Sequence, residues 1–360
     1  MSFLNPSLYF SYLAKLYVKN FLWVLLGLSF SFAAIDYFQH VEKLNATSNY
    51  KILYIFYLWQ GALAILYPLA IVFALIMTKI SLIKSNTMGA FHAFGYSKKK
   101  VFAPLFFVAI SVYFSFFGLH TTAFSYAQDK ADALLNNELD AYNVNDIFFK
   151  YNDTFVYINK LNPIQKEIED ITIFKVENDL VHYTINAPKA VFLNGKWIAY
   201  DAIVKTHIYE NNELKRYHIE HQKSIQTLEG YKPKIIESLY EGKALNLEDI
   251  YITWKLLHKQ HLNSNKIRAA LYDKIVIPLF SIAMLLILFY KLPFHARMTN
   301  MGVVIALSLG SVFVVWGILF GLGKMGENGA ISPELGTVLP IVLLGAYAIY
   351  LYYTDEKRIH

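Results

Sequence analysis

KSNTMGAFHAFGYSKKK, residues 84–100, is a short basic turn between two long apolar runs of the chain. It decides the fold because a local excess of lysine keeps a short loop in the cytoplasm and so sets the direction of every neighbouring membrane span. Within it, Met88, Phe91 and Phe94 recur every three residues and predict a short amphipathic helix that ends at Gly95. So short a helix needs a surface to dock against, and both a cytoplasmic partner and the lipid surface fit.

The composition is that of an integral membrane protein. Of the 360 residues, 56% are apolar and only 17% are charged, which is too apolar for an ordinary soluble protein. Lysines at the ends of spans explain the net charge of +6. Nucleic-acid binding is not predicted, because the sequence has no basic face that alternates with exposed aromatic residues. Because the chain has no cysteine, disulfides, thiolate catalysis and cysteine-ligated metals are excluded.

Six apolar runs predict six transmembrane helices, three on each side of a polar insert. The second run would be about 48 Å long as one helix, so it must tilt or protrude from a hydrocarbon core of about 30 Å. The runs are residues 21–38, 52–83, 101–124, 275–292, 301–322 and 335–353. The predicted domains are an N-terminal membrane half (1–126), an extracytoplasmic β domain (127–245), a connecting helix and return segment (246–274), and a C-terminal membrane half (275–360).

The insert has the alternating pattern of antiparallel strands, in segments such as DTFVYINKL, DITIFKV and RYHIEH. Turn-forming pairs separate them and predict an all-β, jellyroll-like domain. These turn signals are Tyr151-Asn152-Asp153, Asn178-Asp179, Asn194-Gly195 and Asn211-Asn212. The apolar residues expected to face inward and line a groove or core are Phe155, Ile158, Ile173 and Val191.

Lysine and arginine in the short loops favour one orientation. The short loops predicted to lie outside carry only Lys43, Lys51 and Lys324, and the inside segments carry the larger set. That set is Lys15, Lys19, Lys79, Lys84, Lys98, Lys99, Lys100, Lys291, Arg297, Lys357 and Arg358. Both termini are therefore expected in the cytoplasm and the β domain outside it.

No catalytic or metal site is predicted. The chain contains no GxxxxGK[ST] phosphate-binding loop, so it is not expected to hydrolyse ATP by itself. Two histidine pairs, 218/221 and 258/261, have neither HExxH spacing nor a nearby third ligand, which favours solvated or interfacial histidines over metal. Asp36 and His120 lie in or near apolar runs, where polar side chains either line a pathway or reach the headgroups.

In this order the elements resemble the LptF/LptG permease family, the membrane subunits of the ABC exporter that extracts lipopolysaccharide from the inner membrane. The basic turn is similar to that family's loop between spans two and three, with Thr87 and His92 at the usual glutamate and arginine positions. The residues that match are Ala90, Ala93, Gly95 and Ser97. YLAKLYVKNFLWVLLGLSFSFAAIDYFQ is similar to the family's first helix and, with Asp36, favours LptG over LptF.

The resemblance implies a mechanical subunit that binds no cofactor of its own. Its implied partners are lipopolysaccharide, a paralogous permease, a dimer of cytoplasmic ABC ATPases that use ATP and Mg, a single-span LptC-like subunit and a periplasmic LptA-like bridge. The implied ATPase-coupling residues are Lys84, Thr87, Met88, Phe91, His92, Phe94, Gly95 and Ser97. The implied lateral gate and lipid path comprise Gly27, Ser31, Asp36, Lys43, Lys51, Gly317 and Gly321.

Two other classes of protein remain open at this point. An ABC-associated mechanotransmission subunit could also have a large external domain, although the usual layout places it after the first of four spans. A membrane-embedded enzyme that modifies lipid head groups would need acids, bases or metal ligands converging at one membrane depth, and the sequence displays no such set.

The orientation can be tested with topology reporters. A reporter fused after His360 and one inserted within residues 84–100 are expected in the cytoplasm, whereas one between Asn194 and Gly195 is expected outside it. Protease protection or a compartment-specific enzyme fusion gives the measurement. A cytoplasmic signal from the reporter at Asn194 would reverse the whole predicted orientation.

Overall fold

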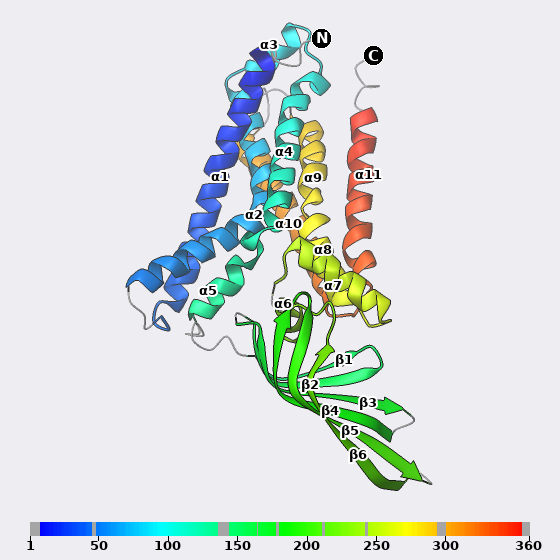
Figure 1. Ribbon diagram of the computed structural model, residues 1–360. Coiled ribbons are helices and arrows are strands. Elements are labelled where there is room, and N and C mark those ends of the chain that lie inside the picture. The colour runs from blue at the N-terminus through cyan, green and yellow to red at the C-terminus, as the bar shows by residue number, and fades with distance from the viewer. Residues whose placement is uncertain are drawn as a thin grey trace. The chain divides into compact units, whose positions relative to one another are not determined.

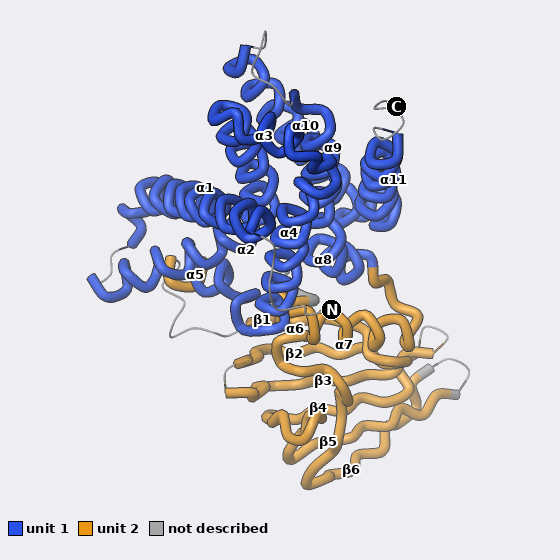
Figure 2. Tube along the Cα trace, turned by 90° about the horizontal axis from the view of Figure 1, so that it is seen from above, with its two compact units in different colours: residues 1–131, 265–360 blue, residues 132–264 orange. Residues whose placement is uncertain are grey.

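The computed structural model describes residues 8–44, 48–135, 144–163, 165–177, 180–210, 213–241, 244–293 and 300–354. It divides into two compact units (Figure 2): unit 1 is Met1–Ala131 with Asn265–His360, and unit 2 is Asp132–Ser264. Some residues used above lie outside the described part, namely the turn pairs at 178–179 and 211–212, Arg297, Lys357, Arg358 and His360.

Unit 1 is helical, and its long helices run alternately toward and away from the end that carries α3 (Figure 1). Among the described residues, five helices are long and apolar enough to cross a membrane. They are α1 (Leu8–His40), α2 (Ser48–Lys84), α4 (Lys98–His120), α10 (Met301–Glu327), and the span Glu334–Thr354, which joins η2 (Glu334–Val338) to α11 (Leu339–Thr354). The short helix α3 (Thr87–Ala93) connects α2 to α4.

The fourth predicted span is broken. Residues 275–292 were expected to form one helix, but α8 (Asn265–Ile275) and α9 (Leu279–Lys291) meet at 41°, and only together are they long and apolar enough to cross a membrane. Pro278 stands at the break, where its missing N–H cannot continue the helix. The Tyr113 hydroxyl donates to the carbonyl of Ile275 at 3.0 Å, which satisfies a carbonyl at the break. Counted as one bent span, the pair completes six, and the predicted membrane protein with an inserted β domain is confirmed.

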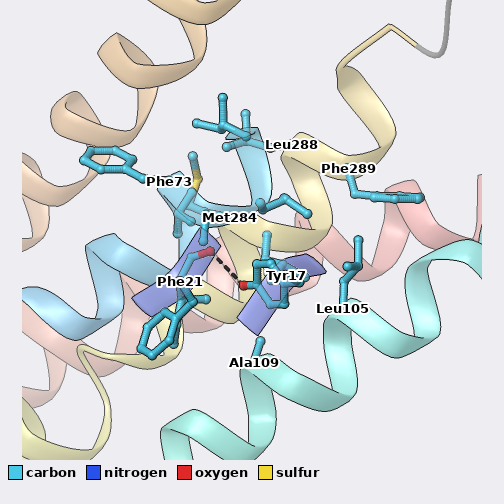
Figure 3. Close-up of a cluster of buried hydrophobic side chains, with 14 of the residues drawn as sticks. Tyr17, Phe21, Phe73, Leu105, Ala109, Met284, Leu288 and Phe289 are labelled. Atoms are coloured by element: carbon cyan, nitrogen blue, oxygen red, sulfur yellow. Dashed lines mark hydrogen bonds between the residues drawn. The ribbon is translucent and has the colours of Figure 1, made fainter. Parts of the chain in front are cut away.

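Helix α2 lies at the centre of unit 1. In the most apolar stretch of 18 residues, 72% of the residues of α2 are buried, against 22% for α1 and 17% for α10. Helix α1 packs on this centre through one narrow stripe in which every fourth residue is buried: Leu13, Tyr17, Phe21, Leu25, Ser29 and Ala33. Tyr17 lies within the apolar cluster of Figure 3, and its hydroxyl donates to the α2 carbonyl of Ile71 at 2.7 Å.

Unit 2 contains a six-stranded antiparallel sheet whose strands follow chain order (Figure 1). The strands are β1 (Val144–Tyr151), β2 (Thr154–Asn162), β3 (Glu167–Glu177), β4 (Leu180–Leu193), β5 (Lys196–Glu210) and β6 (Glu213–Thr227). Two predicted turns are confirmed as two-residue hairpin connections. Asn194 and Gly195 both have positive φ and lie between the paired residues Leu193 and Lys196. Asn152 also has positive φ, and the residues that pair around its turn are Tyr151 and Thr154.

A row of irregular positions crosses the sheet. It interrupts the pairing of every pair of neighbouring strands, although the register is the same on both sides of it. From β1 to β5 the row is Asp146, Asn159, Asp170, Pro188 and Asp201, and its three aspartates have φ between 51° and 56°. The buried residues on either side are therefore three apart instead of two: Val144/Ile147, Ile158/Leu161, Ile168/Ile171, Ala187/Ala190 and Ala199/Ala202. The extra residue in each strand keeps one continuous face apolar across the row.

That apolar face is covered by α6 (Pro233–Glu241) and α7 (Leu247–Lys259). Ile235 and Ile236 of α6 are buried in the same cluster as the strand residues. The Trp197 indole N–H donates to the carbonyl of Tyr231 at 2.7 Å, and burial raises the pKa of the Tyr231 hydroxyl to about 12. The predicted helix after residue 246 is confirmed as α7, whose first turn is capped by Asn246 accepting from the Asp249 N–H at 2.7 Å.

The close packing of η2 against α10 predicts that Gly336 tolerates no larger side chain without a loss of stability. A Cβ on Gly336 would lie 2.5 Å from the backbone oxygen of Leu322, whereas a Cβ on Gly345 of α11 would meet no atom of the described residues within 4 Å. Gly336→Ala is expected to cost about 1–3 kcal/mol because the backbone has to shift. Gly345→Ala is the matched control and should be neutral or slightly stabilising. Thermal unfolding of the purified chain in detergent compares them, and equal midpoints would contradict this packing.

Candidate functional site

Helix α3 is a well-terminated single element. The Gly95 N–H donates to the carbonyl of His92 and the Tyr96 N–H to that of Phe91, at 3.0 and 2.9 Å, which is the hydrogen-bond pattern of a Schellman motif. Gly95 has φ +78°, a conformation that glycine adopts without strain. The rings of Phe91 and Tyr96 meet edge to face at 5.7 Å and supply the apolar contact of that motif. The prediction that Gly95 ends the helix is confirmed.

The three apolar residues of α3 have different environments. Met88 is fully buried in the core of unit 1, and Phe91 is half-buried against the same core. Tyr96, which contacts Phe91, also packs on Tyr9 at the start of α1, with ring centroids 4.5 Å apart. Phe94 is 80% exposed. In this conformation only Phe94 presents a large apolar side chain to a partner.

The polar residues of the turn mostly serve its local structure. The Thr87 and Ser85 hydroxyls are hydrogen-bonded at 2.7 Å, and Ser97 caps α4 by accepting from the Lys100 N–H at 3.3 Å. Lys84 is exposed and His92 is half-buried. Lys84 ends α2 and Phe94 follows α3, so residues 84–94 carry one exposed cation and one exposed aromatic ring.

Sequence reasoning counted Lys79 only as one more lysine of the basic turn, but the side chain is fully buried. Its ammonium group donates to the carbonyls of Phe289 and Leu292, the latter at 2.7 Å. It also lies 4.9 Å from the centroid of the Phe289 ring. The signal was present in the sequence, since a lysine inside an apolar run is expensive to bury and usually has a specific partner.

The predicted gate residues are mostly open to the surroundings of the chain. A Cβ on Gly27, Gly317 or Gly321 would meet no atom of the described residues within 4 Å. Ser31 and Lys43 are exposed and Lys51 is half-buried. These glycines therefore pack against nothing within the described chain and leave room for lipid or another subunit.

Asp36 is the predicted gate residue with defined partners. Its Oδ1 accepts from the Tyr54 hydroxyl at 2.8 Å and lies 3.0 Å from His40 Nδ1. Tyr54 belongs to α2 and is buried. The carboxylate therefore fixes one end of α1 to the central helix.

The four predicted jellyroll residues lie on two different faces of the sheet. Ile158 and Ile173 are buried on the face that α6 covers. Phe155 precedes the buried Val156, and Val191 follows the buried Ala190, so both point to the other face. A single groove lined by all four residues is therefore not formed.

On that other face, Phe155 belongs to an aromatic patch. Its ring stacks on Phe148 and Phe174 with centroids 5.8 Å apart in both cases. Phe148 is 53% exposed. The patch offers an apolar surface that extends across three strands.

The described residues contain no group of three or more His, Cys, Asp or Glu side chains able to hold a metal ion. His218 and His221 lie on β6, where their odd spacing sends them to opposite faces of the sheet. The two therefore cannot act as a ligand pair in this strand.

Comparison with known families gives one match, and it covers nearly the whole chain. The family described as Lipopolysaccharide export system permease LptF/LptG matches residues 11–354. No curated protein sequence matches the chain. The family match spans both membrane halves and the β domain, so it applies to the complete arrangement described above.

Met88 and Phe94 give a paired stability prediction. Met88→Ala removes a fully buried side chain and should lower the free energy of unfolding by about 2–5 kcal/mol. Phe94→Ala should change it by no more than about 0.5 kcal/mol, because the ring is exposed. Thermal unfolding in detergent measures both. A large loss for Phe94→Ala would mean that this ring is packed, and α3 would then have no exposed apolar contact.

Proposed function

The chain belongs to the LptF/LptG family of lipopolysaccharide export permeases and is a multi-pass inner-membrane protein, and from that premise we propose its place in an ABC exporter. In this proposal it pairs with a paralogous permease, as the LptG-type member of the two, and is driven by a dimer of cytoplasmic ATPases that supply all ATP and Mg chemistry. An LptC-like subunit and an LptA-like bridge would receive the lipid.

The observation that carries the proposal is the form of the segment between α2 and α4. Helix α3 ends in a Schellman motif, its Met88 side chain is buried in the core of unit 1, and Phe94 at its C-terminal end is exposed. An exposed aromatic ring and the exposed Lys84 on the same segment suit a small protein joint, in which the ring supplies apolar burial and the cation supplies orientation. Thr87 takes the place of the family's usual glutamate, so the joint depends more on apolar contact here.

Lipid would enter along the open faces of α1 and α10. Gly27 and Ser31 on α1, and Gly317 and Gly321 on α10, leave shallow surfaces where an acyl chain or a partner helix can approach the backbone. Lys43 and Lys51 would attract lipid A phosphates as point charges near the outer end of α1.

The β domain would then carry the acyl chains outside the membrane. The aromatic patch of Phe148, Phe155 and Phe174 is the surface we propose for this contact, because the opposite face is filled by the domain's own core. The orientation with both termini and α3 in the cytoplasm is part of the same proposal.

The coupling contact can be tested at Phe94. Phe94→Asp is expected to weaken binding of the ATPase partner by about tenfold or more, because a buried phenylalanine contributes about 1.5–3 kcal/mol and an unpaired charge in its place adds a desolvation cost. A pull-down from membranes at matched expression measures the retained partner. Phe94→Leu, which keeps an apolar side chain, is the matched control, and Thr87→Glu is expected to be tolerated. Full retention by Phe94→Asp would favour a helix that rests on lipid.

The lipid path can be tested by photo-crosslinking from the two faces of the sheet. A crosslinker at Phe155 should capture lipopolysaccharide during ATP-driven transport, and one at Ile158 should capture none because that position is fully buried. Samples without ATP provide the background. Capture from Ile158 and not from Phe155 would place the path on the opposite face and would require α6 to leave the sheet. If the purified chain altered the lipid chemically without any ATPase partner, the result would instead favour a membrane-embedded enzyme that modifies lipid head groups.

A further inference from the structure

The end of α9 offers carbonyl groups that its own helix cannot satisfy. The last four carbonyls of an α-helix have no intrahelical donor and together carry a partial negative charge. In α9 these belong to residues near Lys291, and two of them, on Phe289 and Leu292, accept from the Lys79 ammonium group. A side chain of α2 thus completes the end of a helix more than two hundred residues away in the chain.

Lys79 occupies a defined position relative to α3. It lies five residues before Lys84, the last residue of α2, and α3 follows after a two-residue turn. On the far side of α3, Lys99 at the start of α4 lies 4.4 Å from the Tyr352 ring centroid of α11. Phe102 of α4 packs on Phe289 itself, with centroids 4.9 Å apart. The two helices that flank α3, α2 and α4, therefore both contact the C-terminal half of unit 1, and Lys79 of α2 makes the contact that is buried and charged.

From this geometry we propose that Lys79 is the positioning residue that makes α3 and the end of α9 move as one body. The ammonium group is held by two carbonyls and the Phe289 ring, and separating them would leave a buried charge without these partners in an apolar interior. Displacement of α3 is then transmitted to the C-terminal half through α9. This inference rests on the proposed coupling of α3 to an ATPase, and it adds the route by which the push crosses the membrane unit.

The first experiment needs only the isolated chain. Because the chain has no cysteine, cysteines introduced at the exposed positions Ala90 on α3 and Lys291 on α9 can carry the only two spin labels. Pulsed electron paramagnetic resonance in detergent should give a narrow distance distribution for the otherwise unchanged chain and for Lys79→Arg, which keeps the charge. It should give a clearly broader one for Lys79→Met.

Lys84→Met is the matched control, because it removes the same charge from an exposed position five residues further on. It should leave the distribution narrow. Equal distributions for Lys79→Met and Lys84→Met would overturn the proposal, whatever the partners of the chain turn out to be.

The second experiment uses the complete complex and does not depend on the folding of a variant. With the same two labels and Lys79 intact, trapping the ATPase in its closed state should leave the distance between the labels unchanged, because both ends move together. A nucleotide-dependent change in that distance would overturn the proposal.

A third experiment measures transport in proteoliposomes. There, Lys79→Met should lower the lipid released per ATP hydrolysed by about tenfold, a change typical of coupling between sites, and Lys79→Arg should restore it. An unaltered ratio would show Lys79 to be only a packing residue. Failure of any ATPase to bind would count against the proposed function and leave the result from the isolated chain standing.

Discussion

A polar group buried among apolar helices has to find its partner inside the protein, because lipid offers no hydrogen bonds. In unit 1 this constraint fixes how the helices meet. Between α1 and α2, Tyr17 donates to the carbonyl of Ile71, Asn20 to Thr78, and Trp59 to Ser29, over distances of 2.7 to 3.0 Å. The apolar stripe of α1 alone would allow it to slide along α2, since apolar contact has no direction. The polar pairs select one register.

The helices could be predicted from the sequence because length and apolarity are properties of a single segment. The same is true of the end of α3, where Gly95 is recognisable from its neighbours alone. What the sequence could not supply is which atoms from distant segments meet. The sequence shows that Lys79 lies inside an apolar run but not that the carbonyls at the end of α9 are its partners. It also does not show that the Leu322 carbonyl approaches Gly336 while nothing approaches Gly345 among the described residues.

The sheet shows a different limit. Its strands and two of its turns follow from alternation and from the pairs Asn152-Asp153 and Asn194-Gly195. Alternation gives the two faces of a strand but does not say which is buried. Phe155 and Ile158 were assigned to one groove because both are apolar, although residues three apart in a strand face opposite ways. The row through Asp146, Asp170 and Asp201 adds a second difficulty, since each positive φ shifts the alternation by one residue. A spacing of three between apolar residues, with an aspartate before the second, is the signal that marks it.

The distribution of burial explains why the segment between α2 and α4 is an effective place to apply force. Helices α1 and α10 keep most of their surface open, which suits contact with lipid or another subunit, whereas α2 is enclosed by the rest of unit 1. A push delivered to an outer helix would be dissipated by its displacement in the lipid. Helix α3 follows α2 after a two-residue turn and is anchored by Met88 in the same core, so a force on α3 acts first on the most buried helix of unit 1. Close packing then transmits the displacement to them, because a packed interior has little free volume in which to absorb it.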